Sequence, residues 1–184
     1  MAGNKHTLIA LVEDKPGVMN RVSSLLRRRG FNIESIAVGK SELPNLSRMT
    51  FVIDGAAVIV EQARKQLAKL IDVVKVADIT DGDVVARELA LIKVHATSTT
   101  RSEIIQIVSI FRANIIDVAH DSLTIEATGD EDKIDSLYNL LLRFGIKEFT
   151  RTGRIAMLRG GTGSVQQIEE KLMSARRARP EGSP

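Results

Sequence analysis

The residues best suited to chemistry lie in one short segment, Asp14-Lys15-Pro16-Gly17, between an apolar run and an amphipathic stretch. At such a strand-to-helix junction, the free N–H groups of the first helical turn and the positive end of the helix dipole form a seat for a carboxylate. Gly17 has no side chain, so a small ligand can approach the backbone closely. The Asp14 carboxylate either caps the helix or accepts hydrogen bonds from an ammonium group. The segment therefore predicts a site for an amino acid.

Further candidate residues follow Gly30, at the start of the next predicted strand. The amide of Asn32 offers a donor and an acceptor, while Ile33 and Val18 supply small apolar surroundings. In a split βαβ sheet this strand can lie at an edge, where a second subunit would extend the sheet. Together with the carboxylate seat, these residues predict a small aliphatic amino acid as the ligand.

A simpler interpretation is that the Pro-Gly turn only starts a helix and that Asn32 is an ordinary turn residue. The second half of the chain provides an internal control. Its equivalent junction, residues 96–100, starts a helix with neither Pro nor Gly. A helix start here does not require Pro-Gly, which favours a function particular to the first half.

Signatures of catalysis are absent from the sequence. There is no GxSxG, HExxH, P-loop or GxGxxG motif, no cysteine, and no close spacing among the three histidines. Glu13 and Asp14 are adjacent on a strand end, so their side chains point to opposite sides. The glycine-rich segment 159–163 lacks the P-loop lysine, which favours a linker over a phosphate cradle. We expect no catalytic residue, no metal site and no cofactor in this chain.

Composition limits the partners. Of 184 residues, 43% are hydrophobic and 27% charged, which is typical of globular domains. The net charge is +3, and from Arg159 onward five basic residues face three acidic ones, so the preceding body is nearly neutral. Aromatic residues make up only 3%, too few for a base-stacking surface. No apolar run is long enough to span a membrane, and no signal or transit peptide is visible. We expect a cytoplasmic protein that binds neither membrane nor nucleic acid.

Apolar spacing predicts two similar units. In the first, it predicts strands at 7–12, 32–40, 48–54 and 73–79. The helix after Gly17 has five apolar residues on its inner face, which are Val18, Met19, Val22, Leu25 and Leu26. The second helix has four, which are Ile59, Ala63, Leu67 and Leu70. In the second unit, strands are predicted at 89–94, 114–119, 123–127 and 146–150, with two helices between them. Both units read β-α-β-β-α-β.

The predicted fold class is therefore α+β, with two tandem ferredoxin-like βαββαβ domains. The polar segment 78–85 predicts a linker between domains at 6–80 and 87–158. Asn32-Ile33 recurs as Asn114-Ile115 after a helix, which indicates a divergent repeat. Residues 159–184 predict a basic, flexible tail with one short amphipathic helix.

Several strings in this chain resemble the regulatory (small) subunit of acetolactate synthase, also called acetohydroxyacid synthase, whose N-terminal unit is an ACT domain. The most specific are RGFNIESIAV, which begins at Arg29, and Ser47-Arg48-Met49-Thr50. Matches run from about residue 7 to 158. The other matching strings are residues 13–17, Arg21-Val22, Glu61-Gln62, Gln66-Leu67, Lys69-Leu70, residues 87–94 and residues 111–118.

The resemblance implies a non-catalytic subunit that stimulates a large catalytic subunit and confers feedback inhibition by a branched-chain amino acid, usually valine. Thiamine diphosphate, Mg and FAD are expected only in that catalytic partner. ACT domains of the family pair side by side as a homodimer with the effector between them. The family's loop corresponds to Asp14, Gly17 and Val18 of one subunit, and its contacts from the other subunit to Asn32 and Ile33. Gly39 occupies a position where the family places a small residue.

Two other functions compete with this one. An ACT-type transcriptional or nucleic-acid-binding regulator would carry a helix-turn-helix or ribbon before the ACT unit, and the sequence has none. A stand-alone enzyme would turn over substrate without a partner chain. Many bacterial relatives have an Asn-x-x-Gly-type loop where this chain has Asp14 and Pro16, so the preferred amino acid stays open.

Overall fold

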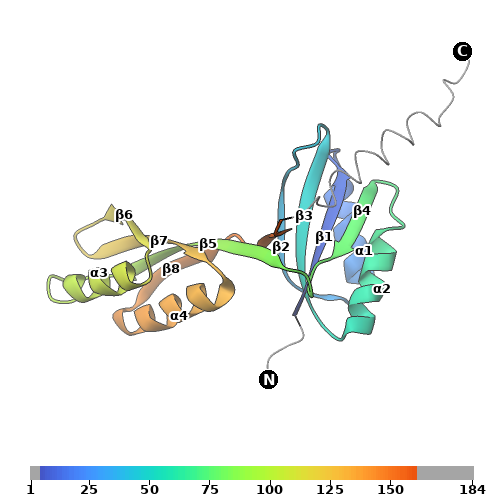
Figure 1. Cartoon of the computed structure of the whole chain (residues 1–184). Coiled ribbons are helices and arrows are strands. Elements are labelled where there is room, and N and C mark those ends of the chain that lie inside the picture. The colour runs from blue at the N-terminus through green and yellow to red at the C-terminus, as the bar shows by residue number, and fades with distance from the viewer. Residues whose placement is uncertain (1–4, 161–184) are drawn as a thin grey trace, which may run out of the picture.

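The computed structural model describes residues 5–160 of the chain. The N-terminal half contains β1 (Lys5–Glu13), α1 (Val18–Arg28), β2 (Asn32–Lys40), β3 (Leu46–Asp54), α2 (Ala57–Leu67) and β4 (Val73–Asp78). The strands form an antiparallel sheet in the order β2-β3-β1-β4, so β2 is an edge strand of this sheet, as predicted. Both helices cover one face of the sheet and enclose a hydrophobic core with it (Figure 1).

The C-terminal half repeats this arrangement. It contains β5 (Val84–His95), α3 (Arg101–Ile110), β6 (Asn114–Val118), β7 (Ser122–Gly129), α4 (Glu131–Leu141), the short 3-10 helix η1 (Leu142–Phe144), β8 (Ile146–Arg151) and β9 (Ile155–Leu158). The strand order β6-β7-β5-β8 is the order of the first sheet. A second hydrophobic core lies between this sheet and its two helices. The predicted fold class, two tandem ferredoxin-like units, is confirmed.

The two halves share a fine detail at the Asn-Ile pair that recurs in the sequence. In the first sheet the pairing of β2 with β3 shifts register between Ile33 and Ser35. In the second sheet the pairing of β6 with β7 shifts between Ile115 and Asp117. Each shift adds one unpaired residue, which bends the strand locally. The recurring Asn-Ile pair therefore marks the same bulge in both halves.

The helix-free face of the N-terminal sheet is covered by part of the C-terminal half. Thr7 and Val52 are paired neighbours on this face, and both are buried. β9 lies against it, with Ala156 buried and its carbonyl accepting a hydrogen bond from Nη2 of Arg48 at 3.1 Å. The first four residues of β5 pair with β9, and the rest of β5 continues into the second sheet (Figure 1). The long strand β5 therefore belongs to both halves of the molecule.

Two predicted core positions are wrong. Met19 is 45% exposed, because the buried stripe of α1 runs through Val18 and Val22 beside it. Ile59 is 42% exposed, and its neighbour Val60 is fully buried instead. The first turn of α2 is apolar all round, so spacing from Ala63 onward fits either residue, and only packing against the sheet selects one.

The connection between the halves also differs from the prediction. β5 begins at Val84, inside the segment predicted as a linker. β9 is a strand that the sequence pattern does not predict, because four residues are too few to show a period. Within the described residues, no helix combines the length and apolarity needed to cross a membrane. The helix predicted in the basic tail lies outside the described residues.

Candidate functional site

The predicted turn between β1 and α1 forms, and its backbone is specialised. Gly17 precedes the first residue of α1 with φ at 86°. Residues with a Cβ rarely adopt this angle, so the turn requires glycine. Among the described residues, the N–H groups of Met19 and Asn20 have no acceptor, and the Asp14 side chain has no hydrogen-bond partner. Asp14 therefore does not cap α1, and the seat keeps free N–H donors.

Arg21 lies beside this turn, although the apolar spacing of the helix predicts it only as a solvent-facing residue. Its Nε donates to Oδ2 of Asp72 at 2.6 Å and its Nη2 donates to Oδ1 at 2.8 Å. A Cβ placed on Gly17 would lie 3.7 Å from Nη1 of Arg21. Within residues 5–160, Nη1 has no acceptor of its own. A free guanidinium donor therefore lies next to the free N–H groups of α1.

Asp72 fixes this guanidinium in place. Its side chain is 9% exposed, and its backbone oxygen accepts a hydrogen bond from the N–H of Glu13 at 2.8 Å. The bidentate pairing orients the planar guanidinium. The sequence signal for Arg21 was available: a long side chain one turn into a helix projects back toward the N-terminus. Asp72 could not be found this way, because it comes from a different connection.

The other predicted site residues lie in different places. Val18 is buried in the core under α1, so its side chain cannot line the seat. Asn32 is exposed, and Ile33 is half-buried against the core. Gly39 is exposed on β2 and lines a groove of about 300 Å³ between β2, β3 and β9. A Cβ added to Gly39 would lie in open space, with nothing within 4 Å beyond its chain neighbours.

Within one chain, the two groups of candidate residues are far apart. Asn32 pairs with Asp54, and Asp54 pairs with Lys5 at the start of β1. The turn that holds Gly17 follows Glu13, at the other end of the same strand. Eight residue steps of β strand span about 27 Å. A single chain therefore does not bring Asn32 and Gly17 together, whereas Gly39 lies near the Gly17 end of the sheet.

In the part of the chain that the structure describes, no group of three or more His, Cys, Asp or Glu side chains is placed to hold a metal ion. The donors that are available at the turn, backbone N–H groups and a guanidinium, suit an anion rather than a cation.

Comparison with known proteins gives matches along both halves. A family model described as an AHAS small subunit-like ACT domain matches residues 8–75, and one described as the small subunit of acetolactate synthase matches residues 87–160. A probable acetolactate synthase small subunit from Archaeoglobus fulgidus is 55% identical over 156 residues, covering 85% of this chain and 98% of that protein. The acetolactate synthase small subunit of Mycobacterium bovis is 50% identical over 163 residues, covering 89% and 97%.

A solved structure agrees with these matches. The crystal structure of the acetolactate synthase small subunit from Thermotoga maritima superposes with a TM-score of 0.80 at 44% sequence identity. The alignment covers 86% of this chain and 99% of that one. Both halves of the fold described above therefore occur together in that solved structure.

Proposed function

This chain belongs to the family of acetolactate synthase small subunits, and from that premise we propose that it lets valine, or a related branched-chain amino acid, inhibit a catalytic partner. In this proposal the chain is a regulatory subunit without catalytic residues of its own. It stimulates the large catalytic subunit, which holds thiamine diphosphate, Mg and FAD. The predicted resemblance to this family is confirmed, and the effector and its site are the proposal.

The observation that carries the proposal is the anion seat at the start of α1. Two free backbone N–H groups and Nη1 of Arg21 converge beside Gly17, where no side chain blocks a ligand. The carboxylate of an amino acid meets these donors and the positive end of the helix dipole. The unpaired carboxylate of Asp14 lies in the same turn and suits the ammonium group of the ligand.

A second copy of the chain completes the site. β2 is an edge strand with an unpaired outer side. If two copies pair along β2 about a two-fold axis, the strands run antiparallel, so the start of one β2 lies beside the end of the other. The partner's Asn32 and Ile33 then reach the end of the sheet that carries Gly17 and Gly39. This pairing removes the separation of about 27 Å that one chain imposes.

The assembled site discriminates among amino acids by size. Ile33 offers a branched apolar wall to a short aliphatic side chain, and the amide of Asn32 offers an acceptor to the ammonium group. Gly39, with open space around it, leaves room for the pairing of the two β2 strands. A small branched side chain such as that of valine fits these surroundings.

Calorimetry on the full chain tests the proposal. Valine is expected to bind, and Gly17→Asp and Asn32→Ala are each expected to weaken binding at least tenfold. Gly17→Asp places a negative charge in the carboxylate seat, and Asn32→Ala removes the amide. Gly145→Asp is the control for the first variant, because Gly145 also has a positive φ, 91°, but lies in the C-terminal half. Asn114→Ala, at the equivalent bulge, is the control for the second.

The catalytic partner provides the second readout. Acetolactate formation by the large subunit is expected to rise when this chain is added, and valine is expected to reverse the gain. Undiminished valine affinity in both site variants would remove the assigned site. A large subunit whose activity ignores this chain would instead remove the regulatory role.

A further inference from the structure

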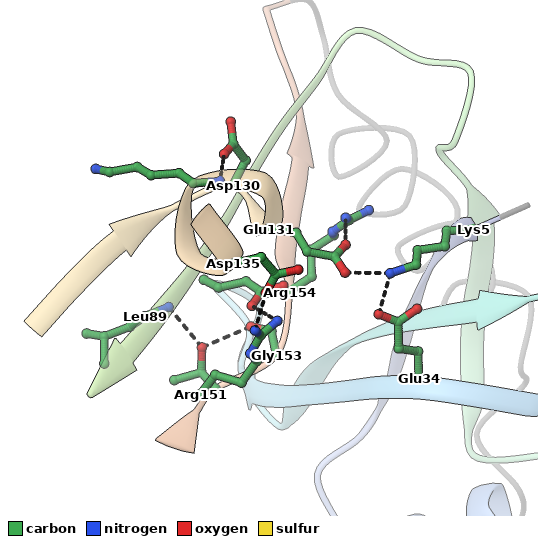
Figure 2. Close-up of polar contacts among 12 residues, drawn as sticks. Lys5, Glu34, Leu89, Asp130, Glu131, Asp135, Arg151, Gly153 and Arg154 are labelled. Atoms are coloured by element: carbon green, nitrogen blue, oxygen red, sulfur yellow. Dashed lines mark hydrogen bonds and ion pairs between the residues drawn. The ribbon is translucent and has the colours of Figure 1, made fainter. Parts of the chain in front are cut away.

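The two halves of the chain are joined by a cluster of charged residues at one end of the N-terminal sheet (Figure 2). Nζ of Lys5, at the start of β1, donates to Oε1 of Glu34 at 2.6 Å and to Oε1 of Glu131 at 2.5 Å. Glu34 lies on β2, and Glu131 is the first residue of α4. Lys5 therefore connects the edge strand of the first half to a helix of the second. We call Lys5, Glu34, Glu131 and Arg154 the interdomain clamp.

Arg154, from the connection between β8 and β9, closes the clamp. Its Nη2 donates to Oε2 of Glu131 at 2.9 Å, and its Nη1 donates to the Thr7 hydroxyl at 3.2 Å. Both oxygens of Glu131 are thus held, and its side chain is only 16% exposed. Burial is the largest single influence on Glu131 and raises its pKa, but the hydrogen bond and the charge of Lys5, together with the charge of Arg154, outweigh burial. The pKa of Glu131 therefore lies below its ordinary value. The clamp holds an ionised carboxylate.

The clamp begins one residue from the proposed effector site. Glu34 directly follows Asn32 and Ile33 and lies in the β2 bulge, where the register shifts between Ile33 and Ser35. Ser35 also lies close to the second half, because a Cβ added to Gly153 would lie 3.1 Å from the Ser35 Cβ. A bulge breaks the regular ladder. A ligand held by Asn32 and Ile33 therefore lies next to the strand segment that approaches the second half.

On the far side, α4 carries the connection into its own half. Glu131 and Asp135 are one helical turn apart and share a face. Asp135 pairs with Nη2 of Arg151 on β8, and Nη1 of Arg151 lies 3.5 Å from Oε2 of the buried Glu88 on β5. One end of α4 is therefore tied to the first half through Glu131, and the next turn is tied to the sheet of the second half.

We propose, on the basis of the function proposed above, that the interdomain clamp transmits effector binding to the C-terminal half. An amino acid that contacts Asn32 and Ile33 shifts the backbone of the β2 bulge. The ion pairs of Lys5 with Glu34 and Glu131 transmit this shift to α4. Because the seat at Gly17 comes from the other copy, the effector bound by one chain acts on the second half of its partner. Coupling between sites of this kind typically changes affinity or response about 5- to 150-fold.

The test compares Lys5→Met with two matched variants in the full chain. Lys5→Met keeps the length of the side chain and removes its charge, and Lys5→Arg restores the charge. Lys65→Met is the control, because Lys65 pairs with Glu61 within α2 at 3.4 Å, outside both the clamp and the proposed effector site. Valine affinity is measured by calorimetry, and hydrogen exchange of residues 131–141 is measured with and without valine. Valine inhibition of the complex with the large subunit is the functional readout.

The wild type, Lys5→Arg and Lys65→Met are expected to bind valine, and valine is expected to change the hydrogen exchange of α4 in all three. Lys5→Met is expected to bind valine with an affinity within about threefold of the wild type, but valine should no longer change the hydrogen exchange of α4. Inhibition of the complex should need at least tenfold more valine. If Lys5→Met does not fold, Glu34→Gln, at a half-exposed position, is expected to show the same loss in weaker form.

Two contrary outcomes are distinct. Suppose that Lys5→Met or Glu34→Gln binds valine, shows the valine-dependent change in α4 hydrogen exchange and is inhibited like the wild type. That result would overturn the role of the clamp and leave the proposed function intact. A wild-type chain that does not bind valine would overturn the proposed function, and the role of the clamp with it.

Discussion

At the scale of single residues, the site depends on positions that have unusual freedom or lack a partner. Gly17 adopts a backbone angle closed to other residues, and the carboxylate of Asp14 contacts no donor among residues 5–160. Arg21 differs, since Asp72 holds two of its nitrogen atoms and leaves the third beside the seat. An arrangement needed only to start α1 would not require that third nitrogen to face Gly17.

Substitution of Arg21 tests this interpretation. Arg21→Met is expected to weaken valine binding about tenfold, because one charge-assisted hydrogen bond to a carboxylate is lost. The same change leaves Asp72 without its partner, so we expect the free energy of unfolding to fall by about 1–2 kcal/mol. Calorimetry gives the affinity, and urea denaturation gives the stability. Arg28→Met, at the other end of α1, is the control, and a loss of affinity there as large as at Arg21 would contradict the assignment.

The turn at Gly17 could be predicted from the sequence because its geometry is local. The order Asp-x-Pro-Gly followed by an amphipathic helix contains the turn, the glycine and the free N–H groups in consecutive residues. The Val18 side chain begins the buried stripe of α1, so its place in the site stays a prediction. Asp72 could not be predicted, since its contact with Arg21 spans 51 residues and depends on the tertiary packing of β4 against β1.

At the scale of elements, the strands and helices followed from apolar spacing wherever a core lies on one side. The β-α-β-β-α-β order of each half is therefore correct, and the edge position of β2 follows from that order. Apolar spacing failed to predict the buried residue of α2, where Ile59 and Val60 are equally apolar. It also failed to predict β9, which is short and, within residues 5–160, pairs with β5 alone. In both cases the decisive contact comes from an element distant in sequence.

The strand β5 carries a buried acid at the point where it passes from one half to the other. The Glu88 side chain is 6% exposed, and its Oε2 has no hydrogen-bond partner among the described residues. Burial raises the pKa of Glu88, with Arg151 opposing the rise. A carboxyl whose pKa is higher in the folded than in the unfolded chain lowers stability when it is ionised. This cost is present at neutral pH and disappears as the pH falls through the folded pKa.

Glu88→Gln is therefore expected to stabilise the protein at pH 7 by about 1 kcal/mol, or about 2–4 °C in Tm. The gain should shrink at pH 4, where Glu88 itself is protonated. Thermal denaturation across this range measures both effects. Glu148→Gln, an exposed position on β8, is the control and should change Tm by less than about 1 °C. A Glu88→Gln chain less stable than the wild type at pH 7 would show that pairing with Arg151 outweighs burial.

At the scale of the whole molecule, the proposed site needs a second copy of the chain. Its two groups of candidate residues lie at opposite ends of one sheet. The proposed two-fold pairing along β2 would bring one group of each chain beside the other group of its partner. The second half is not an independent appendage, because β5 and β9 cover the first sheet and the interdomain clamp ties α4 to β1 and β2. The domain limits predicted at 6–80 and 87–158 stay predictions, since β5 serves both halves.

The shared site can be tested by mixing two defective chains. In a two-fold dimer of Gly17→Asp with Asn32→Ala, one site combines both substitutions, and the other combines the intact Gly17 of one chain with the intact Asn32 of its partner. Each variant alone is expected to bind valine weakly. An equal mixture, unfolded and refolded together, is expected to regain wild-type affinity at about one site in four, because half of the dimers are mixed.

Calorimetric titration of that refolded mixture with valine is the most direct measurement of the central claim. We predict a tight phase with wild-type affinity at about a quarter of the wild-type stoichiometry. A mixture that binds no more valine than the two variants measured separately would contradict a site shared between two chains.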